Sequence, residues 1–389
     1  MKKIRRILVG ILVLWVGFCI LSGIPHFFRF LSHTGLSVVE RELQEQTPEG
    51  YTFYYDQLSE QEQTAYRAVL YGVSHSQDEF YIGNDYTPEI IKRIMYAFTY
   101  DYPEYFWCLR YQTKIYSDQA YYLVFEEDDN RELEAAELKK QADKIVQEIS
   151  AKKGKYKQIK AMYDYIINHT EYVENSQYDQ DIRSVLLNQK SVCSGYAKTF
   201  QYLCKLVGIA CTTVNGYSIE PGGTKIPHSW NLLRLKDQYY WIDVTWGDSR
   251  DTTRETYVNY RYFMIADDPF LNLHKIDEYM DYQTRENTLF TYPECQDKTM
   301  SYYYKKGCYF QSYDKKKIRQ YLSSRLKKNL HAHIELQFAD KKAYQKAYRD
   351  LIQNRNIEEI YKGYIPYNTR VSYEYAYDED YYLLSFNIP

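Results

Sequence analysis

The stretch "VCSGYAKTFQYLCKLVG", residues 192–208, decides the fold of the central part of this chain because it predicts a helix that begins at a cysteine. Apolar residues recur at helical spacing at Ala197, Phe200, Leu203, Cys204 and Val207. Gly208 is the stop signal, and Cys193 falls at the helix N-terminus. Unpaired backbone N–H groups and the helix dipole stabilise an anion there, so Cys193 is placed to act as a thiolate nucleophile. Cys204 lies on the buried stripe and is predicted to pack.

Two strands follow, "HSWNLLRL" and "QYYWIDVTW", joined by the dipeptide Lys236-Asp237. A two-residue turn there pairs Leu235 with Gln238, so that Asp243 becomes the diagonal neighbour of His228 on the same face. Such neighbours are about 7–8 Å apart along the backbone, which is within side-chain reach. A four-residue turn would put them directly opposite each other, and a three-residue turn without a bulge would send them to opposite faces.

A thiol at a helix start and a His–Asp pair on one hairpin face are the parts of a nucleophilic site. The imidazole of His228 would accept the Cys193 proton, and Asp243 would fix its tautomer and direction. Taken singly, each residue has a structural interpretation: a packed thiol, a satisfied half-buried histidine, and an aspartate that caps the following turn. The combination favours catalysis.

Four further residues flank this predicted site. Gln189, four residues before the cysteine, could donate a hydrogen bond to an oxyanion. Tyr196, Trp230 and Trp246 could wall a substrate groove, with core packing as the alternative for each.

Three motifs in order, "VCSGYAKTFQYLCKLVGI", "GYS" and "HSWNLLRLKDQYYWIDVTWGD", resemble the transglutaminase-like superfamily of papain-type cysteine enzymes, in its bacterial membrane-anchored branch. The resemblance covers roughly residues 155 to 275 and includes "YFMIADDPFLNLHK". It implies an α+β, papain-like core: a helix bearing Cys193 packed on an antiparallel sheet that bears His228 and Asp243. It also implies those three residues as nucleophile, base and orienting acid. The sequence departs from the family pattern at Ser191, where many relatives have glycine.

The N-terminus carries a second strong signal. Four basic residues between Lys2 and Arg6 precede an uncharged run from Ile7 to Ile24, long enough for a helix to cross a hydrocarbon core of about 30 Å. The basic flank predicts a single-pass membrane anchor with a cytoplasmic N-terminus and an extracellular catalytic domain. A cleaved signal peptide is the alternative, although the run exceeds the usual apolar core and no small-x-small cleavage site follows. A cytoplasmic catalytic domain would require this charge bias to be overridden.

The pattern of apolar and polar residues predicts four regions. These are an anchor at 1–30, an N-terminal α+β region at 31–154, a central region at 155–290, and a small C-terminal α+β domain at 291–389. The resemblance implies that the central region is a transglutaminase-like catalytic domain.

Within the N-terminal region we expect a helix with a capping box at Ser59 and Glu62, a helix starting at Pro88, a hairpin formed by "LRYQTKIY" and "AYYLVFEE", and charged helices broken at Gly154. In the C-terminal domain we expect a strand in "MSYYYKKGCYF", a helix in "DKKKIRQYLSSRLKK", a strand in "AHIELQFA", a helix from Lys341 to about Tyr361, and a final strand pair.

Composition and motif content argue against several classes of function. The net charge of −3 over 389 residues and the lack of a dominant basic block argue against nucleic acid as the main partner. No glycine-rich phosphate loop is present. The seven cysteines show no zinc-like spacing, so no metal and no cofactor are expected.

The sequence therefore predicts a membrane-anchored, surface-facing cysteine enzyme that acts on peptide or glutaminyl amide bonds through a thioester acyl-enzyme. Its substrate would be a protein or peptide, with a cell-wall-associated one as an option. Hydrolysis is favoured over cross-linking because a competing amine would need a dedicated binding site. The alternative is a non-catalytic surface binding or scaffold protein that keeps the transglutaminase-like fold.

Overall fold

A computed structural model describes residues 47–115, 120–126, 130–220, 222–248, 258–276, 279–281, 286–287, 290–331, 333–366 and 373–387. They divide into two compact units, one that ends at Arg131 and one that begins at Glu132. The predicted membrane anchor, residues 1–30, lies outside the described residues. In the part of the chain that the structure describes, every helix is too short or too polar to span a membrane. The predicted domain bounds stay predictions.

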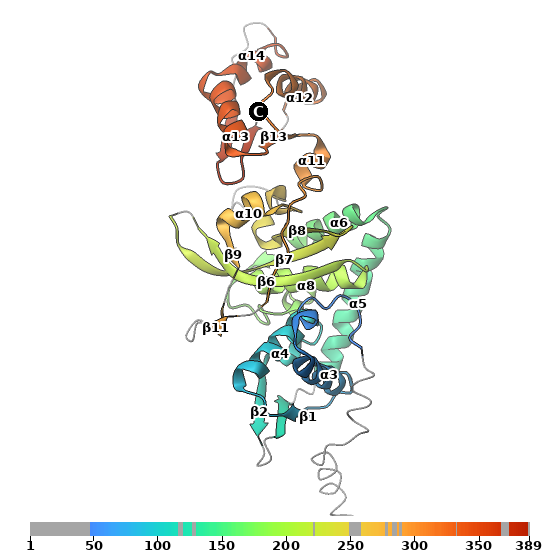
Figure 1. The fold of residues 1–389 in the computed structure, drawn as a ribbon. Helices are drawn as coiled ribbons and strands as arrows, with labels where there is room; N and C mark the ends of the chain where they lie inside the picture. The colour runs from blue at the N-terminus through green and yellow to red at the C-terminus, as the bar shows by residue number, and fades with distance from the viewer. Residues whose placement is uncertain are drawn as a thin grey trace, which may run out of the picture. The chain divides into compact units, whose positions relative to one another are not determined.

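The first unit packs two helices with a three-stranded antiparallel sheet (Figure 1). Its elements are η1 (Tyr55–Gln57), α3 (Glu60–Ser74), β1 (Glu79–Asn84), α4 (Pro88–Asp101), η2 (Phe106–Leu109), β2 (Tyr111–Ile115) and β3 (Ala120–Phe125). The predicted capping box is confirmed, since the Glu62 carboxylate accepts the Ser59 N–H at 2.8 Å while the Ser59 hydroxyl accepts the Glu62 N–H. Pro88 opens α4, and the predicted hairpin pairs β2 with β3. Strand β1 was not predicted.

The second unit is built around a four-stranded antiparallel sheet with the order β8–β7–β6–β9 (Figure 1). Helix α8 lies across β6 and β7, and α6 and α7 pack on α8. The helices α5 and α6 are separated at Gly154, as predicted, where φ is 90°. The elements are α5 (Arg131–Ser150), α6 (Lys155–His169), β4 (Glu171–Tyr172), α7 (Ile182–Leu186), β5 (Lys190–Ser191), α8 (Cys193–Leu206), β6 (Ala210–Ile219), β7 (Lys225–Leu235), β8 (Gln238–Ile242), α9 (Val244–Gly247), η3 (Tyr260–Tyr262), α10 (Asp267–Leu273), β9 (His274–Ile276), β10 (Tyr279–Asp281) and β11 (Glu286–Asn287).

The turn between β7 and β8 sets the register of the hairpin. Lys236 and Asp237 both adopt left-handed conformations, with φ of 52° and 59°. This is the two-residue turn that suits a twisted hairpin, and it pairs Leu235 with Gln238 as predicted. The ladder ends at Asn231 and Ile242, so the prediction of a strand running to Trp246 is wrong. Residues Val244–Gly247 form the one-turn helix α9 instead, because the Asp243 side chain accepts the Trp246 N–H and caps it.

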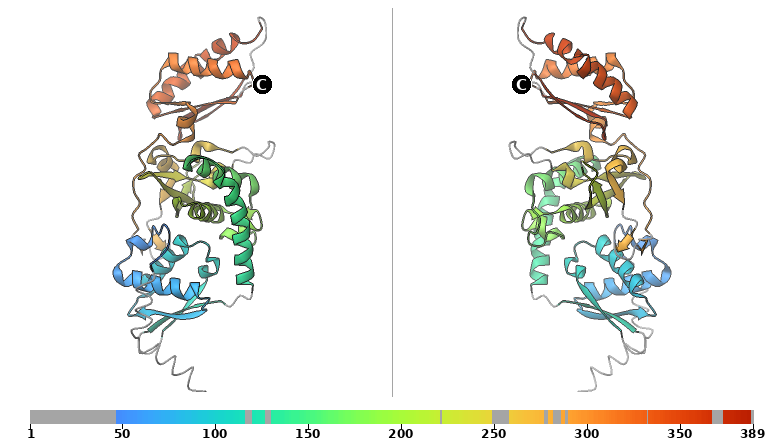
Figure 2. Two further views of the ribbon diagram at one scale, coloured as in Figure 1. Left: turned by 90° about the vertical axis from the view of Figure 1, so that its right-hand side faces the viewer. Right: turned by 90° about the vertical axis from the view of Figure 1, so that its left-hand side faces the viewer.

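The C-terminal part of this unit is a mixed sheet with the order β12–β13–β15–β14, and the helices α12, α13 and α14 lie on one side of it (Figure 2). Its core is aliphatic and aromatic, and includes Leu322, Leu336 and Phe386. The elements are α11 (Tyr302–Lys306), β12 (Tyr309–Phe310), α12 (Lys315–Lys328), β13 (His333–Phe338), α13 (Lys341–Tyr348), η4 (Arg349–Gln353), α14 (Asn356–Lys362), β14 (Glu374–Asp378) and β15 (Leu383–Asn387).

Two predictions for this part are wrong. The tyrosine-rich run expected as a strand forms a strand only at its end, Tyr309–Phe310, and its middle is the helix α11. Ser301 caps the start of α11 by accepting the Tyr304 N–H, and Gly307, at a φ of 73°, ends it. The long helix expected from Lys341 to Tyr361 continues past Tyr348 as a π-helical segment, Arg349–Gln353, and is broken at Arg355, at a φ of 55°, before α14 begins at Asn356. The helix α12, the strand β13 and the final strand pair are confirmed.

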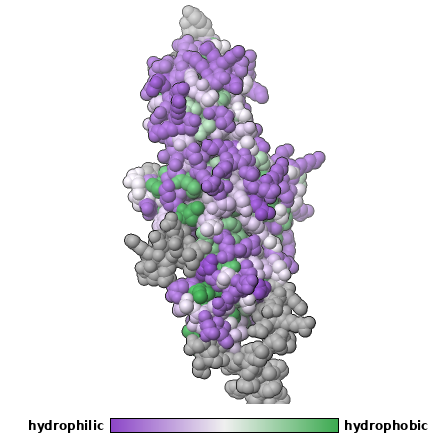
Figure 3. Space-filling view, viewed as in Figure 1, coloured by the Kyte–Doolittle hydropathy of each residue, from purple (hydrophilic) through white to green (hydrophobic). Residues whose placement is uncertain are grey.

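The face drawn in Figure 3 is mostly hydrophilic. Large side chains such as Trp230, Trp241 and Phe200 are fully buried instead. The apolar stripe of α8 points into this core, since Phe200, Leu203 and Cys204 are each 0% exposed. Along α8, Cys193 at the start is partly exposed and Leu206 at the end is exposed, whereas every residue from Ser194 to Cys204 is buried.

Candidate active site

Cys193 is the first residue of α8 and is partly exposed. The residue before it, Val192, is extended and has no side chain that can cap the helix. The N–H groups of the first helical turn therefore stay available beside the thiol, as the sequence predicted. The other five described cysteines are buried.

Ser191, the departure from many relatives, is accommodated just before the thiol. Its hydroxyl is fully buried and lies 2.6 Å from the Ser184 hydroxyl, which ties β5 to α7. Gly195 makes this possible, because a Cβ at that position would lie 2.1 Å from Ser191 Oγ and 2.4 Å from Ser184 Oγ. The entry to α8 is thus held by a serine pair that depends on a glycine one turn later.

His228 and Asp243 meet in the core, as predicted, although Asp243 lies just beyond the β7–β8 ladder, whose last pair is Asn231 with Ile242. His228 lies on β7 opposite Gly216 of β6, and its Nε2 is 2.7 Å from Asp243 Oδ2. Asp243 also caps α9 through Oδ1, so the structural and the functional interpretations of this residue hold together. The Cys193 thiol is near enough to the same imidazole to contribute to its raised pKa. With Nε2 turned to Asp243, Nδ1 is the ring nitrogen left for the thiol.

The electrostatics of the pair favour an ionised imidazole. Burial by itself lowers the pKa of His228, but the charge and hydrogen bond of Asp243, together with Cys193, raise that pKa to about 10. Burial likewise raises the pKa of Asp243, but His228 and His274 outweigh it and hold that pKa well below its usual range. At neutral pH the site therefore contains an imidazolium next to a carboxylate.

His274 was not predicted as a site residue. It begins β9, it is 0% exposed, and its Nε2 lies 2.9 Å from Asp243 Oδ2. Its ring stacks on Phe270, with centroids 3.8 Å apart and planes 11° apart. The signal was the histidine next to the end of "YFMIADDPFLNLHK", but its place depends on the pairing of β9 with β6, which residue spacing does not reveal.

Tyr172 was also missed. Strand β4 pairs with β5 in parallel and sets Tyr172 beside Ser191, two residues before the nucleophile. Its side chain is 47% exposed. Burial, and after it the nearby Cys193, raises the pKa of Tyr172 to about 12. Its hydroxyl thus stays protonated next to the thiol at neutral pH.

The four flanking residues take different positions. Trp230 is fully buried, with its ring centroid 5.1 Å from that of His274. Trp246 is half-buried and lies 5.6 Å from the His228 ring. Tyr196 is buried, and its hydroxyl lies 2.8 Å from Asp248 Oδ2. Gln189 is exposed at a φ of 56°, and its proposed hydrogen bond to an oxyanion stays a prediction.

Among the described residues, His228, Asp243 and His274 have the spacing that a metal ion could use, since their ligand atoms lie within 4.8 Å of one another. Ligand atoms about 2.0–2.2 Å from a tetrahedral zinc ion lie more than 3 Å apart. Here both nitrogens lie within 2.9 Å of the same oxygen. The arrangement is that of N–H···O hydrogen bonds.

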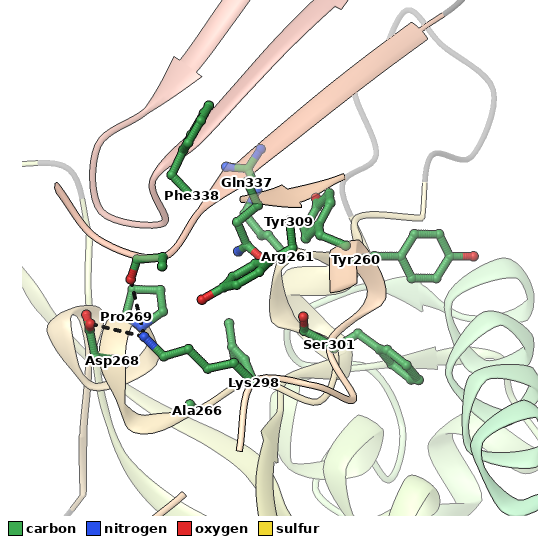
Figure 4. A pocket seen from close by; sticks show the side chains of 14 residues that line it. Tyr260, Arg261, Ala266, Asp268, Pro269, Lys298, Ser301, Tyr309, Gln337 and Phe338 are labelled. Atoms are coloured by element: carbon green, nitrogen blue, oxygen red, sulfur yellow. Dashed lines mark hydrogen bonds and ion pairs between the residues drawn. The ribbon is translucent and has the colours of Figure 1, made fainter. Parts of the chain in front are cut away.

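A cavity of about 20 Å³ lies where η3 and α10 meet the C-terminal sheet, and Figure 4 shows its side chains. Lys298 Nζ enters it and lies 3.5 Å from Asp268 Oδ2 and 3.3 Å from the Ala339 carbonyl. A volume of this size holds about one water molecule. The cavity is therefore too small to be a substrate site.

A thiol at a helix N-terminus that faces a buried imidazole–carboxylate pair is an arrangement of the cysteine-enzyme type. Residues 143–245, which include Cys193, His228 and Asp243, match the family described as the transglutaminase-like superfamily. This chain therefore carries a transglutaminase-like domain.

Known proteins resemble parts of the chain. It is 30% identical over 132 residues to the kyphoscoliosis peptidase of Mus musculus, a match that covers 30% of this chain and 20% of the relative. It is 32% identical over 101 residues to the kyphoscoliosis peptidase of Homo sapiens, over 23% of this chain and 15% of the relative. The chain thus spans a fifth or less of the length of these curated relatives. A solved periplasmic domain of TgpA from Pseudomonas aeruginosa is 16% identical, with 34% of this chain and 60% of that chain covered and a TM-score of 0.23.

Proposed function

We propose that this protein is a cysteine peptidase or amidase that hydrolyses peptide or glutaminyl amide bonds with Cys193 as nucleophile, His228 as acid and base, and Asp243 as the orienting carboxylate. The observation that carries the proposal is the buried pair of His228 Nε2 and Asp243 Oδ2, 2.7 Å apart, in the same site as the partly exposed Cys193 thiol at the start of α8. A fold kept only as a scaffold has no need to bury an ionised pair behind a partly exposed thiol.

The raised pKa of His228 decides how the reaction begins. Since His228 is an imidazolium at neutral pH, it can stabilise negative charge on the sulfur of Cys193 as that sulfur attacks. A C–S bond forms to the substrate carbonyl carbon, and the N–H groups of the first turn of α8 lie beside the thiol to stabilise the resulting oxyanion. His228 Nδ1 then gives its proton to the leaving nitrogen as the C–N bond breaks.

The second half returns the enzyme to its starting state. The acylated sulfur carries no charge, so it no longer stabilises the imidazolium, and the neutral ring can accept a proton from water. The hydroxyl adds to the thioester carbonyl, the C–S bond breaks, and a carboxylic acid leaves. The thiolate and the imidazolium are thereby restored.

Hydrolysis is proposed over cross-linking on two grounds. The curated relatives are named as peptidases, although the chain spans only a fifth or less of their length. A cross-linking enzyme would also have to hold an amine against competition from water. The residues around Lys2 to Ile24 support anchoring in the cell membrane with the catalytic domain outside, and this location is part of the proposal.

The test is to measure release of p-nitrophenolate from p-nitrophenyl acetate, a generic acyl donor, by the wild type and by Cys193→Ala. A matched Cys308→Ala variant, which removes a buried thiol of the C-terminal part, serves as the control. We expect only Cys193→Ala to lose the activity. Equal turnover by Cys193→Ala and the wild type would favour the scaffold alternative.

A further inference from the structure

The carboxylate of Asp243 has a second imidazole neighbour that the proposed reaction does not use. His274 Nε2 lies 2.9 Å from the same Oδ2 that His228 Nε2 approaches to 2.7 Å. A carboxylate oxygen accepts and does not donate, so His274 must donate its Nε2–H. We propose that His274 is a positioning residue that holds the Asp243 carboxylate ionised and oriented toward His228. This inference rests on the proposed function of the same site.

Asp243 needs such a partner because its carboxylate is fully buried and is no longer hydrated. Both Asp243 and His274 are 0% exposed. A buried carboxylate stays ionised only when several hydrogen bonds replace its hydration. The Trp246 N–H donates a hydrogen bond to Oδ1, while His228 and His274 donate hydrogen bonds to Oδ2. The His228 ring exchanges protons during the proposed reaction, whereas the His274 ring has no contact with Cys193 that would change its bonding.

The surroundings of His274 hold its ring in place. His274 pairs with Ser218 of β6, and its ring stacks on the Phe270 ring. The Trp246 ring lies 4.6 Å away. Both ring nitrogens face oxygen acceptors, Nε2 the Asp243 carboxylate at 2.9 Å and Nδ1 the Phe270 carbonyl at 3.2 Å. A neutral ring can donate to only one of them, and the closer, charged acceptor places its proton on Nε2.

The charge state of His274 suits this task. Burial lowers the pKa of His274 despite the neighbouring carboxylate. A neutral ring donates an N–H to Asp243 without placing a second positive charge beside the His228 imidazolium, with which it would compete. His274 can therefore support the carboxylate and leave the Asp243 charge available to His228.

The other titratable groups that face this cluster come from five elements. Four of these groups are tyrosines, and burial raises the pKa of each, so they stay neutral in the pH range where His228 titrates. They are Tyr163 of α6, Tyr172 of β4, Tyr262 of η3 and Tyr381 of the turn before β15. The fifth element, α8, contributes Cys193 and also Lys198, whose pKa burial lowers to about 8. Because Lys198 changes charge in the same range, the titration has to be followed at His228 itself.

Two variants separate hydrogen bonding from packing. His274→Gln keeps an N–H at the position of Nε2 but loses the ring, and His274→Phe keeps a ring on Phe270 but loses the donor. A hydrogen bond to a charged buried group is worth roughly tenfold to hundredfold in an equilibrium. We expect His274→Phe to lose about that factor in kcat/KM for p-nitrophenyl acetate, and His274→Gln to lose clearly less. Thermal unfolding identifies any variant that does not fold, and His274→Asn, whose amide stops short of Asp243, then replaces His274→Phe.

The second readout is the His228 titration, followed by NMR with ¹³C-labelled histidine in the wild type and in Cys193→Ala. We expect the His228 midpoint to move to lower pH in His274→Phe and to stay near the wild-type value in His274→Gln. An unchanged midpoint, a shift to higher pH, or a His274→Gln that is less active than His274→Phe would overturn the inference. The Cys193→Ala background reports on His228 without any reaction. Ester turnover that survives Cys193→Ala would therefore refute the proposed function alone, while the titration still decides the role of His274.

Discussion

Replacing Asp243 with asparagine probes the ion pair on which the proposed chemistry depends. The variant Asp243→Asn keeps the shape of the side chain and an oxygen to cap α9 at the Trp246 N–H, but it removes the charge. A pKa of about 10 for His228, in place of 6.5, corresponds to about 5 kcal/mol in favour of the imidazolium. Asp243 is the main cause of that rise, and burial opposes it.

Without the carboxylate, burial leaves the pKa of His228 at or below its usual 6.5. At pH 7.5 the imidazolium then falls from nearly all of the molecules to about a tenth or fewer. Loss of the correct ring tautomer adds a further reduction, so the total loss of turnover should be about 10²- to 10⁴-fold.

The assay is alkylation of Cys193 by iodoacetamide from pH 5 to 11, with Asp164→Asn as a matched control, because Asp164 pairs with Lys160 away from the thiol. We expect the plateau of the rate at neutral pH to disappear in Asp243→Asn and to remain in the control. Alkylation of Asp243→Asn with a wild-type pH profile would refute the reasoning.

Three further predictions follow from the site. Native protein treated with iodoacetamide should be alkylated at Cys193 alone among the six described cysteines, because the other five are buried; peptide mass spectrometry checks this, and early labelling of Cys204 would contradict it. Because the pKa of His228 is raised, the stability that its ion pair contributes is complete below pH 6.5 and is lost as the pH rises through about 10. The urea concentration at the unfolding midpoint should therefore fall between pH 8 and 10.5. This fall should be absent in His228→Gln. Gly195→Ala should destabilise the fold by about 1–3 kcal/mol in urea unfolding, since its methyl group would overlap two serine hydroxyls. Combination with Ser191→Gly should recover part of that loss, and full additivity of the two changes would argue against the clash.

The parts of the site that could be predicted from the sequence are those that depend on local rules. Helical spacing placed Cys193 at the start of α8, and a two-residue turn fixed the register that carries His228 to Asp243. His274 could not be predicted in the same way, because β9 reaches the site only by pairing with the far side of β6.

The errors elsewhere have a different, local cause. The tyrosines of residues 300–310 have strand propensity, but the Ser301 cap and Gly307 gave this segment a helix instead. The strand predicted up to Trp246 stops at Ile242, because Asp243 uses one oxygen to start α9. Side-chain caps therefore overrode propensity in both places.

The central claim is that Cys193 forms a thioester with an acyl donor and that His228 and Asp243 make this possible. The most direct measurement is mass spectrometry of the intact protein after rapid acid quenching of a reaction with p-nitrophenyl acetate, followed by peptide mapping. We expect an acetyl group on Cys193 that is absent in Cys193→Ala and strongly reduced in Asp243→Asn. Acetylation that appears only on lysines or other surface groups, with Cys193 unmodified, would contradict it.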